Sequence, residues 1–332
     1  MKKIFLIFLF LLLITASNIA SARDWKRLQI PGAKCGNGSE YSIFIDLKSP
    51  TALVIELMGG GACWSASTCY GPNLRTWMYP IPEVPAFSVL SSESPLANKW
   101  KNYSYIYFPY CTGDVYTGNH EASYFPLNRT YHYGARNIKL ALEFLTKNKI
   151  IDFKNLNEVL FWGASAGAIG SLVHTKILDQ YIKPTGVHKV VIADSAGLHF
   201  GQKFWNKFTP ETYKDFEISF ANIGLKIQKN DGLISKGLPK VFETLSDWQI
   251  GILQGTRDIV MSAVFGDISP EEQEKNILGP CGVEKIAENY SNVETWIKKT
   301  YMHTFLIIPE SATLKSEKNE SAIDFIFRVS GK

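Results

Sequence analysis

The segment that most constrains the fold of this chain is Leu156–Gly167, a short apolar run that ends in the motif Gly-Ala-Ser-Ala-Gly around Ser165. From Ala168 to His174 the sequence continues with the spacing of a helix. A strand, a sharp turn and a helix in this order form a nucleophile elbow. The turn forces the serine into a strained conformation, which small flanking glycines and alanines permit. A glycine-rich turn can carry a serine by chance, but the context on both sides makes Ser165 a candidate nucleophile.

The N-terminus has the pattern of a secretory signal peptide. Lys2 and Lys3 precede an unbroken apolar stretch over residues 4–14, and Ala20-Ser21-Ala22 supplies a small-x-small cleavage site. The apolar stretch is short for a membrane span, although an uncleaved anchor is the alternative. We therefore expect cleavage of residues 1–22, a secreted or periplasmic mature protein, and no stable membrane insertion after cleavage.

The length and charge of the remaining chain limit its class. Residues 23–332 suit one large α/β domain or two small ones, and we expect a single domain. The formal net charge is +4, and the charges of Lys2 and Lys3 leave with the signal peptide. The mature chain is then nearly neutral and has no basic cluster, which argues against a nucleic-acid partner. The oligomeric state stays open.

The cysteines are candidates for disulfides, because the chain is expected to be exported. Their odd number leaves at least one unpaired, and the sequence does not give the pairing. No C-x-x-C motif or closely spaced cysteine–histidine set occurs, so we expect no zinc, and we expect no other metal or cofactor. The cysteines are Cys35, Cys63, Cys69, Cys111 and Cys281.

Apolar runs and helical spacing alternate along the chain, which predicts an α/β fold. Strands that alternate with helices form a parallel sheet with right-handed crossovers. Besides the elbow, we expect an early edge strand at 41–46, a buried strand at 51–58, a helix at 135–145, and strands at 103–108, 188–193 and 248–254. Between Tyr70 and Trp100, recurring prolines predict an irregular excursion near the active site. Its aromatic residues from Trp77 to Phe87 either wall an acyl pocket or simply pack.

A serine hydroxyl needs a base to remove its proton, and an acid must hold that base in one tautomer. Three histidines follow Ser165 beyond its own helix. His188 begins a strand and so lies at the wrong end of the sheet, and His199 can line the cleft. His303 is late enough to follow the last strand, and the order serine, acid, histidine of α/β-hydrolases favours it as the base.

Two aspartates follow predicted strands at the sheet edge where catalytic groups gather. Asp194 ends the strand after the elbow helix, and Asp258 follows the next strand. Asp258 occupies the usual position of the acid and is favoured. Asp194 is the alternative acid, a residue that tunes the site, or a turn residue that caps the following loop.

A carbonyl oxygen that becomes negative in the transition state needs preorganised N–H donors. The residue after the nucleophile, Ala166, offers one. Gly59-Gly60-Gly61 follows the buried strand at 51–58, as the glycine-rich oxyanion loop of a hydrolase does. A phosphate-binding role is the competing interpretation, but no G-K-[ST] follows and the next residues are Ala62-Cys63-Trp64.

Taken together, these segments resemble the pectin acetylesterase/Notum family of α/β-hydrolases (carbohydrate esterase family 13), particularly its bacterial branch. The resemblance implies an α/β-hydrolase fold, with Ser165 as nucleophile, Asp258 as acid and His303 as base. It also implies that Gly60, Gly61 and Ala166 supply the oxyanion amides. The matching stretches are Glu56–Trp64, Asn98-Lys99-Trp100, Pro109–Val115, Gly163–Gly167, Asp194-Ser195 and His303-Thr304.

The chain also departs from the family pattern. The segment before His303 lacks the expected glycine-containing turn, and Arg257 places a charge beside the acid. Side chains that can line the site besides the triad are Asp194, His199, Asp114 and Trp64.

The expected function is that of an exported serine esterase that acts through an acyl-enzyme. By the resemblance, its substrate is an O-acetyl group on a polysaccharide or a similar ester. Two alternatives remain: a deacylase or lipase for longer lipid esters, and a catalytically inactive binding protein on the hydrolase scaffold.

Overall fold

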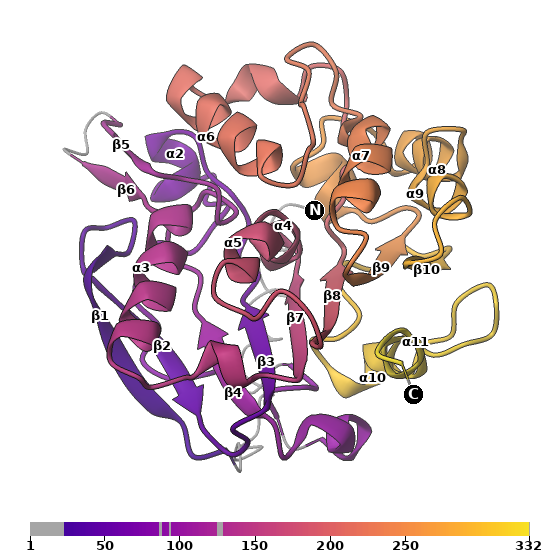
Figure 1. Cartoon of the computed structure of the whole chain (residues 1–332). Helices are drawn as coiled ribbons and strands as arrows, with labels where there is room; N and C mark the ends of the chain where they lie inside the picture. Colours follow the sequence, from indigo (N-terminus) through magenta and orange to yellow (C-terminus); the bar gives the residue numbers. More distant parts are fainter. Residues whose placement is uncertain (1–22, 86–87, 93, 125–128, 332) are drawn as a thin grey trace.

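The chain is built around an eight-stranded sheet in a computed structural model that describes residues 23–85, 88–92, 94–124 and 129–331 (Figure 1). The strands are ordered β1-β2-β4-β3-β7-β8-β9-β10. The pairs from β4 to β10 are parallel, whereas β1–β2 and β2–β4 are antiparallel. The predicted α/β class with a mostly parallel central sheet is therefore confirmed. The predicted signal peptide, residues 1–22, lies outside the described residues.

The central strands β3, β4, β7, β8 and β9 consist almost entirely of buried residues. The strand bounds are β1 Lys26–Lys34, β2 Glu40–Asp46, β3 Ala52–Leu57, β4 Ser104–Phe108, β7 Glu158–Ala164, β8 His188–Asp194, β9 Gln249–Gly255 and β10 Val293–Lys298, with a separate hairpin of β5 His120–Ala122 and β6 Thr130–His132.

The helices connect the strands and cover the sheet. Their bounds are α2 Ala66–Cys69, α3 Gly134–Lys147, α4 Ala166–Val173, α5 Thr175–Asp179, α6 Pro210–Ala221, α7 Leu238–Thr244, α8 Pro270–Leu278, α9 Val283–Ala287, α10 Pro309–Ala312 and α11 Ala322–Val329. Among the described residues, we find no helix with the length and apolarity needed to cross a membrane.

Most predicted elements are present, but one strand has the wrong place in the sheet. Two strands of the main sheet, β1 and β10, and the two hairpin strands, β5 and β6, were not predicted. The segment at 41–46 forms β2, which pairs on both sides and is not an edge strand. The edge is β1, where more than half of the residues are exposed and a proline and a glycine interrupt the apolar pattern, so it gives a weak strand signal. At the other edge β10 was also missed. The strands predicted at 51–58, 103–108, 188–193 and 248–254 and the helix at 135–145 are found within a few residues.

The central strands are buried on both faces, and alternate side chains enter two separate cores. In β3, Leu53 and Ile55 join the core under α3 and α4, whereas Val54 joins the core on the opposite face. In β7, Phe161 and Trp162 divide in the same way. Figure 1 shows α3, α4 and α5 together over one face of the sheet. This two-sided burial fixes the strand register, and with it the positions of the loops at the carboxyl ends of the strands.

Disulfides hold two of those loops. Cys35 pairs with Cys111, which joins the segment after β1 to the loop after β4. Cys63 pairs with Cys69 and closes the segment that follows the glycine run. Cys281 is free. Although His132 lies beside the Cys63–Cys69 pair, the disulfide leaves no thiolate there for a metal.

Candidate functional site

Ser165 occupies the sharp turn between β7 and α4. Its backbone has φ 58° and ψ −120°, a strained conformation for a residue with a side chain. A Cβ on Gly167 would collide with the carbonyl oxygen of Leu57 in β3, and one on Gly163 would collide with the backbone of Gly167. The two motif glycines are therefore required by close packing of the turn. Ser165 itself remains 8% exposed.

His303 and Asp258 come from neighbouring loops and are hydrogen-bonded to each other. The imidazole Nδ1 lies 2.7 Å from Asp258 Oδ2. The other oxygen, Oδ1, accepts the backbone N–H groups of Val260 at 2.9 Å and Met261 at 3.0 Å. Because both oxygens are occupied, the buried carboxylate has one orientation. It holds the proton of the imidazole on Nδ1 and leaves Nε2 as the acceptor nitrogen.

Nε2 of His303 is buried and makes no hydrogen bond within the described parts of the chain. Likewise, no hydrogen bond joins His303 to Ser165 Oγ among those residues. In unliganded sites such contacts are often long and tighten only in the complex with substrate. Both residues follow parallel strands at the same edge of the sheet, Ser165 after β7 and His303 after β10.

Arg257 does not oppose the carboxylate beside it. Its guanidinium binds Glu274, at 2.6 Å from Nη2 and 2.8 Å from Nε. It also donates to the hydroxyl of Tyr301 at 3.1 Å. The charge that departs from the expected pattern is thus compensated by an acidic residue of α8.

The glycine run after β3 lies directly against the elbow. A Cβ on Gly59 would stand 3.2 Å from Ser165 Cβ and 2.8 Å from the carbonyl oxygen of Ala164. Gly61 has φ +80° and lines the same cavity as Ser165 and Ala166. Gly60 packs against the ring of Tyr110 instead, and its carbonyl accepts the hydroxyl of Thr76 at 2.6 Å. Since α4 begins at Ala166, its first N–H groups have no acceptor within the helix, and the positive end of the helix dipole faces the serine.

An apolar cavity adjoins Ser165, and phenylalanines dominate its wall. Its free space is about 30 Å³, room for about two water-sized groups. Phe200 and Phe204 stack at 4.0 Å, and Trp64 contacts Phe208 and Phe265 edge to face. The phenylalanines are Phe200, Phe204, Phe208, Phe216, Phe220 and Phe265.

For the aromatic residues from Trp77 to Phe87, an acyl wall and simple packing were both left open; none of those that the structure describes lines this cavity. Trp77 and Tyr79 are each 48% exposed at the surface, and Phe87 lies outside the described residues. The signal for the observed wall was the four-residue spacing of phenylalanines at 200, 204 and 208 and again at 216 and 220. Only the last two share a helix, α6, where this spacing puts them on one face.

The family model of the pectinacetylesterases matches residues 24–229. The chain belongs to this family. It is 27% identical over 244 residues to the palmitoleoyl-protein carboxylesterase NOTUM of Schmidtea mediterranea, a match that covers 61% of this chain and 45% of that protein. The chain thus spans about half the length of this curated relative. The name of this relative is that of a carboxylesterase.

Solved structures of a relative share the fold. Two crystal forms of the Wnt deacylase Notum from Drosophila superpose with TM-scores of 0.59 and 0.61, at 16% and 17% identity. Each comparison covers 92% of this chain, and 93% and 92% of the Notum chains. The match to the pectinacetylesterase family model ends before Asp258 and His303, so the roles of these two residues depend on their geometry.

Two residues that were expected to line the site, His199 and Asp114, do not line the phenylalanine-walled cavity beside Ser165. His199 is 1% exposed and its Nδ1 contacts the carbonyl of Gly197 at 2.5 Å, while burial lowers its pKa to about 4. Asp114 is also buried, and its carboxylate accepts the N–H of Gly134 at 2.7 Å at the start of α3. Both are buried and neither lines the cavity, whereas Trp64 borders the phenylalanine wall.

The alternative acid, Asp194, is close to His303, but its carboxylate binds the loop that carries His303 and not the imidazole ring. Its Oδ2 accepts the backbone N–H groups of Phe305 at 2.7 Å and Leu306 at 2.8 Å. The imidazole is left to Asp258. His188 begins β8 and so lies at the opposite end of that strand from Asp194. Its Nε2 lies 3.1 Å from the carbonyl oxygen of Ser330.

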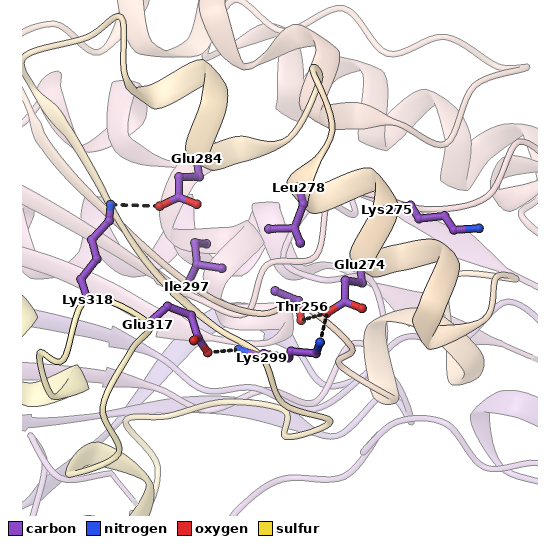
Figure 2. A pocket seen from close by; sticks show the side chains of 9 residues that line it. All are labelled: Thr256, Glu274, Lys275, Leu278, Glu284, Ile297, Lys299, Glu317 and Lys318. Carbon is purple, nitrogen blue, oxygen red and sulfur yellow. Dashed lines mark hydrogen bonds and ion pairs between the residues drawn. The ribbon is translucent and has the colours of Figure 1, made fainter.

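A second cavity of this protein has a volume of about 510 Å³ and is larger than the first. None of the candidate catalytic residues lines it. Figure 2 shows that ion pairs line it, including Lys318–Glu284 at 2.9 Å. The cavity is also lined by Thr256, which donates to Glu274 at 3.1 Å. Its paired charges and lack of a nucleophile make it a poor site for ester hydrolysis.

Proposed function

We propose that this protein is an exported serine esterase that cleaves short-chain acyl esters of a carbohydrate through an acyl-enzyme. Ser165 is the nucleophile, His303 the base and Asp258 the acid that orients it. The observation that carries the proposal is the 2.7 Å bond between His303 and the fully buried Asp258, at the sheet edge where Ser165 is held in its strained turn. Residues 23–332 act as one hydrolase domain.

The proposed reaction has two steps. His303 Nε2 takes the proton of Ser165 as Oγ attacks the ester carbonyl, and Asp258 stabilises the imidazolium that forms. The N–H groups of Gly61 and Ala166 face the developing oxyanion, supported by the dipole of α4, and Gly60 completes the loop that presents them. The imidazolium then protonates the leaving alcohol. A water molecule activated by His303 hydrolyses the acyl-enzyme and restores the serine.

The size of the phenylalanine-lined cavity supports a short acyl group. A free space of about 30 Å³ accepts a methyl or ethyl group, whereas a long chain needs several phenylalanines to move. The apolar lining favours the second candidate, a deacylase for longer lipid esters; the Schmidtea mediterranea relative is named a palmitoleoyl-protein carboxylesterase. Space and lining thus give opposite expectations for chain length, and kinetics decides between them.

The surface beside the glycine run supports a carbohydrate as the alcohol. Thr76 and Met78 are buried, while Arg75, Trp77 and Tyr79 alternate with them and face outward. The rings of Trp77 and Tyr79 stand 5.9 Å apart, and the N–H of Trp77 bonds the carbonyl of Gly60. Exposed aromatic faces beside a guanidinium suit sugar rings that carry acidic groups. The predicted signal peptide and the two disulfides support export.

Covalent labelling tests the proposed function directly. A fluorophosphonate probe should attach to one site in the purified protein, and peptide mass spectrometry should locate it on Ser165, because only an activated serine reacts. The Ser165→Ala variant should take up no label. Absence of labelling in the natural sequence, or equal labelling of Ser165→Ala, would show that the chain is an inactive binding protein or uses another nucleophile.

Chain-length preference should depend on the phenylalanine wall. We expect kcat/KM to be at least about 100-fold lower for p-nitrophenyl palmitate than for p-nitrophenyl acetate. Each factor of ten corresponds to roughly 1.4 kcal/mol of activation free energy. Phe208→Ala, which enlarges the half-buried mouth, should raise activity on the octanoate relative to the acetate by about tenfold. Phe144→Ala in α3 is the matched control, since Phe144 is equally half-buried but packs away from the cavity. A preference of the natural sequence for palmitate would favour the lipid deacylase.

A further inference from the structure

Asp194 binds the nucleophile turn through its backbone and the base loop through its side chain. Its carbonyl oxygen accepts the N–H of Ser165 at 2.8 Å. Its carboxylate accepts the N–H groups of Phe305 and Leu306, at 2.7 and 2.8 Å. One residue thus connects the two segments whose separation determines whether a proton can pass from Ser165 to His303.

From this arrangement we infer that Asp194, assisted by Ser195, is a positioning residue that sets His303 relative to Ser165. The inference rests on the proposed function, because it assigns a role toward the proposed base. Asp194 does not touch the reacting atoms and so acts only through the loop that carries His303.

The contacts cover the three backbone N–H groups that directly follow the histidine. The N–H of Thr304 donates to Ser195 Oγ at 3.1 Å, and Ser195 Oγ donates in turn to Asp194 Oδ1 at 2.9 Å. With Phe305 and Leu306, three successive N–H groups converge on one carboxylate and its serine. Successive backbone donors of this kind form an anion-binding concavity. The carboxylate is therefore built into the turn as its central acceptor.

The backbone of the turn explains why an acceptor is needed. Thr304 has φ 68° and Ser195 has φ 63°, and a β-branched residue in this region is strained. Phe305 and Leu306 are fully buried in the core that also contains Trp296, where an unpaired N–H is costly. Without the carboxylate, the turn would relax toward a different backbone conformation and carry His303 with it.

Charge gives Asp194 a second effect on the base. Burial raises the pKa of Asp194 to about 6, opposed by the N–H groups of Phe305 and Leu306, by Ser195, and by His303, so the carboxylate is ionised at pH 8. The groups that face His303 are Asp258 from the loop after β9 and Asp194 from the end of β8, while Arg257 is turned toward Glu274. A second anion near the imidazole favours its protonated form.

The test compares Asp194→Asn with the natural sequence on p-nitrophenyl acetate. We expect kcat to fall about 10- to 100-fold with KM within about twofold, because binding is kept and proton transfer is misaligned. Because the substitution removes a negative charge near the base, the acidic limb of the kcat/KM profile should move to lower pH. Ser195→Ala, which keeps the carboxylate, should lower kcat about three- to tenfold.

Asp46→Asn is the matched control for loss of a buried carboxylate. Asp46 is 3% exposed and binds Arg23 at 3.2 Å. It pairs with the start of β4, so it lies at the opposite end of the strands from the catalytic site. It should lower thermal stability and leave kcat and the pH profile unchanged. If Asp194→Asn behaves in the same way, Asp194 is merely structural and the inference is wrong.

Two further outcomes keep the inference separate from the proposed function. If Asp194→Asn yields no folded protein, Ser195→Ala decides alone, and an unchanged kcat for that variant overturns the inference. If the natural sequence is active but His303→Ala is equally active, the proposed function itself fails. Activity that requires His303 but is unaffected at Asp194 and Ser195 overturns the positioning role only.

Discussion

His303→Ala should lower kcat about 10⁶-fold and leave no more activity than Ser165→Ala, the scale found when the members of a triad act as a unit. The physical reason is that Nε2 is the only acceptor that Asp258 prepares beside the serine, through the 2.7 Å bond to Nδ1. Without it the hydroxyl keeps its proton. The residual rate should come from the oxyanion N–H groups, which remain in place.

The measurement is burst and steady-state kinetics on p-nitrophenyl acetate for Ser165→Ala, His303→Ala and the double variant. All three should have the same kcat, because the second substitution removes a function already lost. Circular dichroism should show an unchanged fold, since His303 is at the edge of the sheet and makes only one side-chain hydrogen bond among the described residues. If losses multiply in the double variant, the two residues act independently. A large loss in His199→Ala with none in His303→Ala would place the base elsewhere.

The elbow could be predicted because its requirements are local. A serine at φ 58° between glycines that cannot carry a Cβ leaves a short, contiguous sequence signal. The buried central strands β3, β7 and β8 were equally visible, because burial on both faces makes them continuous apolar runs. The edge strands β1 and β10 are not buried on both faces, so they lack a continuous apolar run and neither was predicted.

The cavity wall and the role of Asp194 could not be predicted from local pattern. Phe204 and Phe265 are far apart in sequence and meet only when the loops after β8 and β9 fold over Ser165. Asp194 bonds Phe305 and Leu306, residues more than a hundred positions away. Such partners are set by strand order, which a single sequence does not display. The order of the chain favoured Asp258 over Asp194 as the acid, but the contacts of Asp194 with the loop after His303 depend on the fold.

Asp258→Asn should lower kcat about 10⁴-fold while the protein stays folded, the magnitude found when the acid of a triad becomes an amide. The hydrogen bonds of Asp258 explain how. Oδ1 accepts the N–H groups of Val260 and Met261, so the oxygen of an amide must take that position. Its NH₂ group then faces His303 and donates to Nδ1. The imidazole must carry its proton on Nε2, where it cannot accept one from Ser165.

Comparison with Asp194→Asn identifies which carboxylate serves as the acid. Both aspartates are fully buried, so each substitution removes a buried charge of similar exposure. Asp258 contacts the imidazole itself, whereas Asp194 contacts the backbone beyond it, and a wrong tautomer is more damaging than a displaced loop. We expect the loss at Asp258 to exceed that at Asp194 by about 100-fold or more, measured as kcat at the pH optimum of each variant. A larger loss at Asp194 would mean that the loop rearranges on binding substrate and brings that carboxylate to His303.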